Sequence, residues 1–123
     1  MADPNSISNN FLRHVLANSL FTERQLSIIS KRLQGSGRPE NITSGAYYRQ
    51  VRQCQDKVFA ALYTMVLLQS TGVIQPDGLV TLSRLAEQVR VIFSSENRDI
   101  LGMERITDVM SVMDQLIKRI SNL

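Results

Sequence analysis

The residues from Thr43 to Thr71 are predicted to form one long helix that changes character halfway along. At a rise of ~1.5 Å per residue, such a helix spans roughly 43 Å. Its first half, Tyr47–Lys57, is polar and basic, whereas in Val58–Leu68 only Thr64 lies outside the hydrophobic set. One end of this helix must therefore be buried, and the other must remain in solvent.

The apolar positions of this helix follow a spacing of three and four residues, which is the a/d pattern of a coiled coil or bundle helix. They are Tyr47, Val51, Cys54, Val58, Ala61, Met65 and Leu68. The opposite side carries Arg49 and Arg52 in its first half, but Phe59, Tyr63 and Leu67 in its second half. The second half is thus apolar all round, so we expect other helices or a second protomer to enclose it.

Composition favours one helical domain in a reducing compartment. The 123 residues include no Trp, only three Pro and six Gly, and 43% are hydrophobic, enough for a core. A single cysteine forms no internal disulfide, and the N-terminus lacks the features of a signal peptide, so we expect a cytoplasmic protein. The apolar run Val58–Leu68 is too short to span a bilayer.

Start and stop signals divide the chain into about five helices after a disordered tail at residues 1–6. Thr22 and Gln25 form a capping box, and Gly35 and Gly72 are suited to the ends of the second and third helices. Thr107 is the expected N-cap of the last helix. The expected ranges are 7–20, 23–34, 43–71, 79–93 and 107–120, with a turn at 75–78 and a polar loop at 94–102.

The predicted architecture is all-α, with the long central helix packed in a helical bundle. Residues 7–123 form a single domain, in which 7–57 are the nucleic-acid-binding part and 58–123 the core and dimerisation part. The charge distribution supports this division. Residues 1–57 hold eight Lys/Arg and four Asp/Glu, a balance of +4, whereas residues 58–123 hold six and seven, a balance of −1. Such asymmetry favours an anionic partner, although a swing of this size also arises by chance.

The basic start of the long helix is the predicted nucleic-acid-binding site. Arg donates two hydrogen bonds to guanine, Gln pairs with adenine, and free N–H groups at a helix start suit a phosphate. The candidate residues are Lys31, Arg32, Arg38, Ser44, Tyr48, Arg49, Arg52 and Gln53. The alternative is an ordinary solvated helix face, with Arg52 and Asp56 as an i,i+4 ion pair.

Two segments carry a resemblance to a known family. Phe21–Gly35, FTERQLSIISKRLQG, resembles the opening helix of LuxR-type and sigma-region-4-like helix-turn-helix domains, and similar segments of small archaeal DNA-binding proteins. The segment at 44–53, SGAYYRQVRQ, is similar to their recognition helix. The resemblance implies that Ser44, Tyr48, Arg49 and Arg52 contact bases and phosphates. The family has a short scaffold helix and a tight turn where this sequence has the loop Gly35–Asn41.

No sequence motif points to catalysis or to a cofactor. The chain lacks CxxC, HExxH, Walker and GxGxxG motifs, and its one histidine, His14, has no nucleophile or metal partner in the sequence pattern. Cys54 is expected to be a small buried hydrophobe. We therefore expect a non-enzymatic, homodimeric DNA-binding protein, acting in transcription regulation or chromosome organisation, without metal or cofactor.

Two other functions remain open at this point. One is a helical-bundle protein–protein interaction module, or a subunit of a larger assembly, that binds no nucleic acid. The other is single-strand binding, in which Tyr47 and Tyr48 stack on bases.

Overall fold

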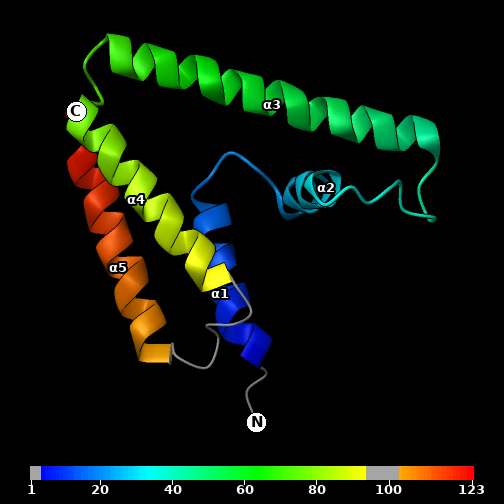
Figure 1. Cartoon of the computed structure of the whole chain (residues 1–123), viewed down its shortest axis with the longest axis horizontal. Coiled ribbons are helices and arrows are strands. Elements are labelled where there is room, and N and C mark those ends of the chain that lie inside the picture. Colours follow the sequence, from blue (N-terminus) through cyan, green and yellow to red (C-terminus); the bar gives the residue numbers. More distant parts are fainter. Residues whose placement is uncertain (1–3, 94–102) are drawn as a thin grey trace. The chain divides into compact units, whose positions relative to one another are not determined.

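The protein is all-α, as the sequence predicts. The computed structural model describes the backbone of residues 4–93 and 103–123 and the side chains of 10–93 and 107–123. It contains five helices and no strand within the described residues (Figure 1). The helices are α1 (Pro4–Ala17), α2 (Glu23–Leu33), α3 (Ser44–Ser70), α4 (Pro76–Phe93) and α5 (Met103–Ile120).

The chain divides into two compact units. The central unit is Leu16–Met65, and the terminal unit combines Met1–Val15 with Val66–Leu123. The sequence places the functional boundary at 57/58, whereas the compact units meet at 65/66, within α3. The first helix, which the sequence analysis assigns to the nucleic-acid-binding part, contributes most of its length to the terminal unit.

In the central unit, α2 packs against the first half of α3. The buried residues are Ile28 from α2 and Tyr47, Val51 and Cys54 from α3, with Ile29 and Ile42 partly buried against them. The predicted seam is therefore confirmed at the start of the long helix. Its three-and-four spacing places these side chains on one side of α3, where α2 covers them.

The predicted caps of α2 are also confirmed. The Thr22 hydroxyl accepts the Gln25 backbone N–H, and the Gln25 side chain accepts the Thr22 N–H at 3.0 Å, which completes the capping box. At the other end, Gly35 adopts a positive φ of 76°. The N–H groups of Gly35 and Ser36 then donate to the carbonyls of Arg32 and Lys31. This pattern satisfies the last carbonyls of the helix.

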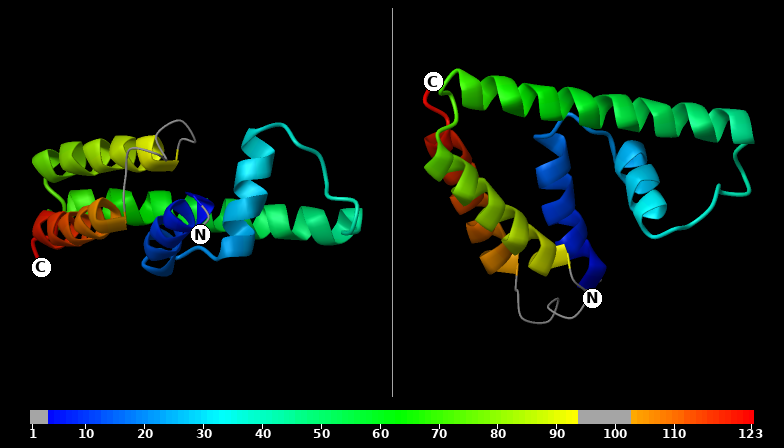
Figure 2. Two further views of the ribbon diagram at one scale, coloured as in Figure 1. Left: turned by 90° about the horizontal axis from the view of Figure 1, so that it is seen from below. Right: turned by 45° about the horizontal axis from the view of Figure 1, so that its top comes forward.

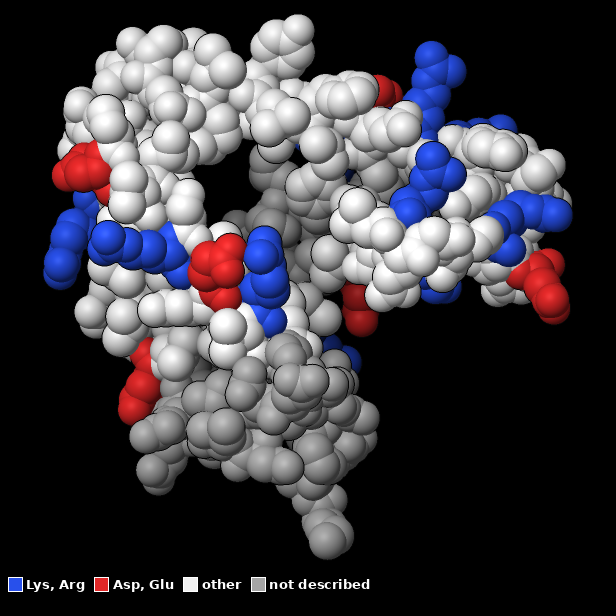
Figure 3. All heavy atoms as spheres, viewed as in Figure 1, with Lys and Arg blue, Asp and Glu red and all other residues white. Residues whose placement is uncertain are grey.

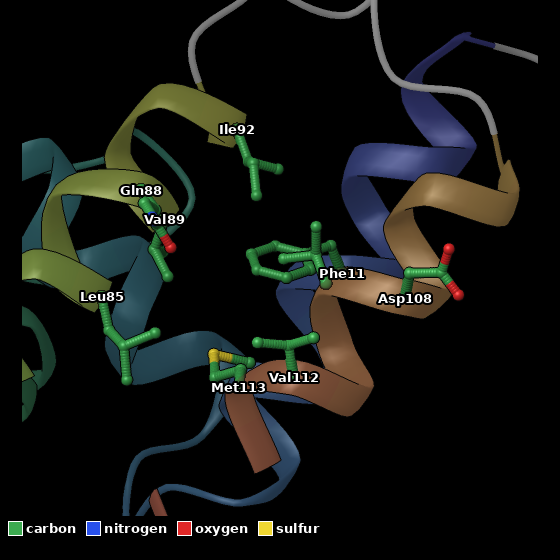
Figure 4. Close-up of a pocket in the computed structure, with 9 residues that line it drawn as sticks. Phe11, Leu85, Gln88, Val89, Ile92, Asp108, Val112 and Met113 are labelled. Carbon is green, nitrogen blue, oxygen red and sulfur yellow. The ribbon is translucent and has the colours of Figure 1, made fainter. Parts of the chain in front are cut away.

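In the terminal unit, α4 and α5 lie side by side (Figure 2). Phe11 from α1 is completely buried between them, together with Leu85, Ile92 and Met113. These side chains point toward one another around a cavity of about 170 Å³, while the Asp108 carboxylate points away from it (Figure 4). The core of this unit is thus shared by three helices that are distant in sequence.

Polar contacts hold the C-terminus of α5 against the α3–α4 connection. The Asn122 backbone N–H donates to the Val73 carbonyl, and its side-chain amide donates to the Gly72 carbonyl, both at 3.0 Å. Gly72 has a positive φ of 83°, which suits the glycine position predicted just beyond α3. His14 and Asp114 form a further link between α1 and α5, with Nε2 and Oδ1 2.9 Å apart.

Three helix starts differ from the prediction. Helix α1 begins at Pro4, so the predicted tail is helical from that residue onward, and α4 begins at Pro76 rather than after a turn. Proline suits the first helical position because its missing N–H has no partner there in any case. Helix α5 begins at Met103, so Thr107 lies inside the helix and is not its cap. The predicted polar loop at 94–102 lies outside the described residues.

The second half of α3 is not enclosed within the described part of the chain. Ala61, Met65 and Leu68 on the predicted seam are partly buried, but the opposite side is exposed. The exposed apolar residues there are Phe59, Leu62, Tyr63, Val66 and Leu67. The expected enclosure of this half by other helices or by a second protomer therefore stays a prediction, because α2 covers only the first half of α3. No helix in the described ranges has the length and apolarity needed to cross a membrane.

Candidate nucleic-acid interface

All eight predicted nucleic-acid-binding residues lie in the central unit. All eight side chains are exposed, and that of Arg38 also donates a hydrogen bond within the α2–α3 loop. Helix α2 contributes two residues from its last turn, the following loop one, and α3 five. In chain order they are Lys31, Arg32, Arg38, Ser44, Tyr48, Arg49, Arg52 and Gln53.

The start of α3 is capped by Thr43. Its hydroxyl accepts the Ala46 N–H at 3.3 Å, and its carbonyl accepts the Tyr47 N–H at 2.9 Å. Thr43 is therefore the N-cap of α3, and Ser44 is the first helical residue. The cap already satisfies one of the free N–H groups on which phosphate binding at this helix start would depend.

Tyr48, Arg49 and Arg52 share the side of α3 that faces away from its buried seam. At ~100° per residue, Arg49 and Arg52 lie opposite the seam of Val51 and Cys54, and Tyr48 lies at the margin of that side, about 60° from Val51. Tyr48 is 65% exposed, and its ring lies 5.7 Å from the Tyr47 ring between the centroids. Tyr47, by contrast, is buried in the core. Tyr47 is therefore not placed to stack on a base, whereas Tyr48 is.

The exposed cations of the central unit are not neutralised by neighbouring carboxylates. Within the described residues, both ion pairs, Arg90 with Glu87 and His14 with Asp114, belong to the terminal unit. The alternative Arg52–Asp56 pair is not formed in this part of the chain. The positive charges on the outer side of α3 are thus free to act on an anion in solution.

The charge asymmetry coincides with the division into compact units. The central unit holds seven Lys/Arg and three Asp/Glu, a balance of +4, whereas the terminal unit holds seven and eight, a balance of −1. In Figure 3, blue side chains predominate around α2 and the start of α3, and blue and red alternate around α4 and α5. The excess charge is therefore a property of one folded part and not only of one stretch of sequence.

Two of the cations have structural roles. Lys57 donates from Nζ to the Leu20 carbonyl and, at 2.9 Å, to the Gln25 side chain, and it lies 5.7 Å from the centroid of the Phe21 ring. Arg38 donates to the Ile42 carbonyl at 2.7 Å, which ties the α2–α3 loop to itself. Lys57 is therefore committed to packing, and Arg38 is only partly available to a ligand.

A second basic surface lies along a groove between α2, the loop and the start of α3. The groove has a volume of about 610 Å³. Its lining includes two cations, Arg24 and Lys31, and one carboxylate, Glu23. The side-chain oxygen of Gln50, which also lines the groove, is buried without a hydrogen-bond partner among the described residues. Arg24 was missed by the sequence analysis. Its spacing of seven residues from Lys31 places both on one side of α2 and would have indicated it.

The structure thus separates Lys31 from the predicted residues on the outer side of α3. Lys31 lies at the groove, on the side of α3 where α2 packs, whereas Tyr48, Arg49 and Arg52 lie on the opposite side of α3. The connection between α2 and α3 covers residues 34–43, which is longer than the three- or four-residue turn of a helix-turn-helix motif.

The Cys54 thiol belongs to the core of the central unit. Cys54 is buried, and its S–H donates to the Gln25 carbonyl with 3.7 Å between Sγ and O. Burial raises the pKa of the Cys54 thiol, an effect that the nearby Lys57 charge partly opposes. Among the described residues, no three His, Cys, Asp or Glu side chains lie close enough together to hold a metal ion.

Comparisons with known proteins give no relative from which a function could be transferred. No protein-family model matches the chain, and no curated protein or solved structure matches it either. Any function must therefore be inferred from the surfaces described above.

Proposed function

We propose that the protein is a non-enzymatic DNA-binding protein that contacts duplex DNA with the outer side of the α3 start. The observation that carries the proposal is the set of exposed, unneutralised cations on this helix within a unit of net charge +4. Phosphate contacts by such cations provide most of the affinity of DNA-binding proteins.

Each residue on the outer side of α3 has a role in this proposal. Arg49 and Arg52 contact phosphates or guanine edges, and Gln53 contacts an adenine edge at the margin of the same side. Tyr48 packs against a sugar or base. The cations at the groove, Arg24 and Lys31, contribute to the field that attracts the duplex.

The proposal includes a homodimer and a role in transcription regulation or chromosome organisation. The resemblance of residues 21–35 and 44–53 to helix-turn-helix domains is consistent with such a role. The long α2–α3 connection means that the similarity concerns the two helices and not the turn between them.

Fluorescence anisotropy with labelled duplex and single-stranded DNA at several salt concentrations tests the proposal. We expect submicromolar binding at low salt, with a log–log slope of about −0.9 per neutralised phosphate on duplex DNA. The variants Arg49→Ala and Arg52→Ala should weaken binding and reduce the slope by roughly 1 each. Arg84→Ala, an exposed arginine of α4, is the matched control and should leave both unchanged.

Two outcomes would contradict the proposal. Failure to bind either form of DNA at low salt would remove DNA from consideration. A preference for single strands that is lost in Tyr48→Ala would replace duplex binding with base stacking.

A second candidate function is a protein–protein interaction module. It is favoured by the exposed apolar residues in the second half of α3, which no DNA contact would cover. In that case the Arg49 and Arg52 variants would have no effect on any DNA affinity.

A further inference from the structure

We infer that the exposed apolar side of α3 is the surface on which a second copy of the chain packs. We call this surface the α3 apolar face. It consists of Phe59, Leu62, Tyr63, Val66 and Leu67, whose side chains are between 56% and 79% exposed. The inference specifies the homodimer of the proposed function but does not depend on DNA binding.

The spacing of these residues is suited to a second helix. Phe59, Tyr63 and Val66 recur at intervals of four and three residues, and Ser70 continues the row four residues further on. This is the spacing by which helices pair through knobs and holes. Because the buried seam lies on the other side of α3, pairing here leaves the contact with α2 intact.

The exposed area is sufficient for a dimer. A fully exposed side chain of this size presents on the order of 150–250 Å², so the five residues together expose roughly 600 Å² of mostly apolar surface. Stable protein–protein interfaces bury about 800 Å² per partner. The α3 apolar face alone therefore reaches the lower end of the standard range, which is about 600 Å² per partner.

A second copy matches this surface because the same row of residues complements itself around a two-fold axis. In an isologous interface each residue of one protomer contacts a residue of the same patch on the other. The α3 apolar face has no charged residue between Phe59 and Leu67, so it pairs with itself without burying an unpaired charge.

Charge determines the direction of pairing. In a parallel pair, Arg49 and Arg52 of the two copies would lie next to one another, because they share the side of α3 that continues into the apolar face. In an antiparallel pair centred on Tyr63, Asp56 lies opposite Ser70 of the second copy. The two Arg52 residues are then roughly 33 Å apart along the helix axes. The antiparallel arrangement therefore avoids repulsion between the basic halves.

Sedimentation equilibrium of the full-length protein and of Val66→Glu tests the inference. We expect the wild type to have twice the 13.9 kDa chain mass at about 50 µM, and Val66→Glu to dissociate at least about 100-fold more readily, because it places a carboxylate in the interface. Val80→Glu is the matched control. It replaces the same residue type at similar exposure, 52% against 65%, on α4, and it should remain dimeric. Circular dichroism of both variants verifies that the helices are retained.

Cysteine cross-linking tests the antiparallel register. Tyr63→Cys should form a disulfide-linked dimer on mild oxidation, whereas Ser70→Cys should not, because the two copies of residue 70 would be roughly 21 Å apart. A monomeric wild type, or a dimer unaffected by Val66→Glu, would overturn the inference. Cross-linking of Ser70→Cys would overturn the antiparallel register. These results differ from a failure to bind DNA, which would leave the dimer unaffected.

Discussion

At the scale of single residues, Gln25 connects three parts of the central unit. Its side chain accepts the Thr22 N–H and the Lys57 ammonium, and its carbonyl accepts the Cys54 thiol. The contact with Thr22 follows from the sequence, because a capping box depends on residues three positions apart. The contacts with Cys54 and Lys57 cross 29 and 32 residues of chain, so they depend on the packing of α2 against α3 and were not predictable.

The Cys54 thiol should make the stability of the protein depend on alkaline pH. Burial raises its folded-state pKa, so the unfolded thiol, with a pKa of ~8.5, loses its proton first. The contribution of Cys54 is therefore fully present below pH ~8.5 and decreases as the pH rises above it. We expect Cys54→Ala to cost about 1 kcal/mol at neutral pH, and the difference from wild type to shrink at pH 9.5, as measured by urea unfolding.

Alkylation rates provide the control for this prediction. The native thiol, which is only 4% exposed, should react with iodoacetamide far more slowly than the thiol of the urea-unfolded protein. Equal rates in the two states, or a wild-type advantage that is the same at both pH values, would contradict the assignment of Cys54 to the core.

At the scale of elements, local signals located three helix termini correctly and three helix starts incorrectly. Thr22, Gly35 and Gly72 act through hydrogen bonds or backbone conformations within a few residues, and each lies where its sequence pattern places it. Thr107 has a hydroxyl suited to capping a helix, but α5 begins four residues earlier, at Met103. The preference of Thr for the N-cap position therefore did not determine where this helix starts. Periodicity correctly indicated which side of α3 faces α2, but it contains no information on how far along α3 that cover extends.

The contact between α4 and the end of α5 should make Gly78 intolerant of a side chain. A Cβ at Gly78 would lie 3.1 Å from Ile120 Cγ2 and 3.5 Å from Ile74 Cγ2. The hydrogen bonds of Asn122 to Gly72 and Val73 restrain this end of the chain, so Ile120 cannot easily move away from an added Cβ. We expect Gly78→Ala to destabilise the protein by about 1 kcal/mol, because crowding outweighs the gain in helix propensity.

Gly45→Ala is the matched control for this substitution. Gly45 also lies in the first turn of a helix, but a Cβ there meets no atom within 4 Å. The Gly45→Ala substitution should therefore stabilise the protein, by up to about 1 kcal/mol. Thermal unfolding of the two variants should show midpoint shifts of opposite sign, and an increase for both would indicate that the end of α5 yields without cost.

At the scale of the whole molecule, the sequence predicted where the basic charge lies but not how it is divided among surfaces. All eight candidate residues belong to the central unit. The separation of Lys31, at the groove, from Arg49 and Arg52, on the outer side of α3, depends on which side of α3 packs against Ile28. From its charge alone, Lys57 could equally have been a candidate nucleic-acid-binding residue. Only the folded structure shows that its ammonium group donates to the Leu20 carbonyl and the Gln25 side chain.

The division of charge between the two units leads to a prediction for the whole chain. Because the central unit carries +4 and the terminal unit −1, a short DNA duplex should perturb amide resonances within Leu16–Met65 and leave those of α4 and α5 almost unchanged in an NMR titration at low salt. The largest changes should occur around Arg49 and Arg52, with smaller ones around Arg24 and Lys31. Changes concentrated in the terminal unit would contradict the proposal, because they would place the anion-binding surface outside the central unit. Changes only around Arg24 and Lys31 would move it from the outer side of α3 to the groove beside α2.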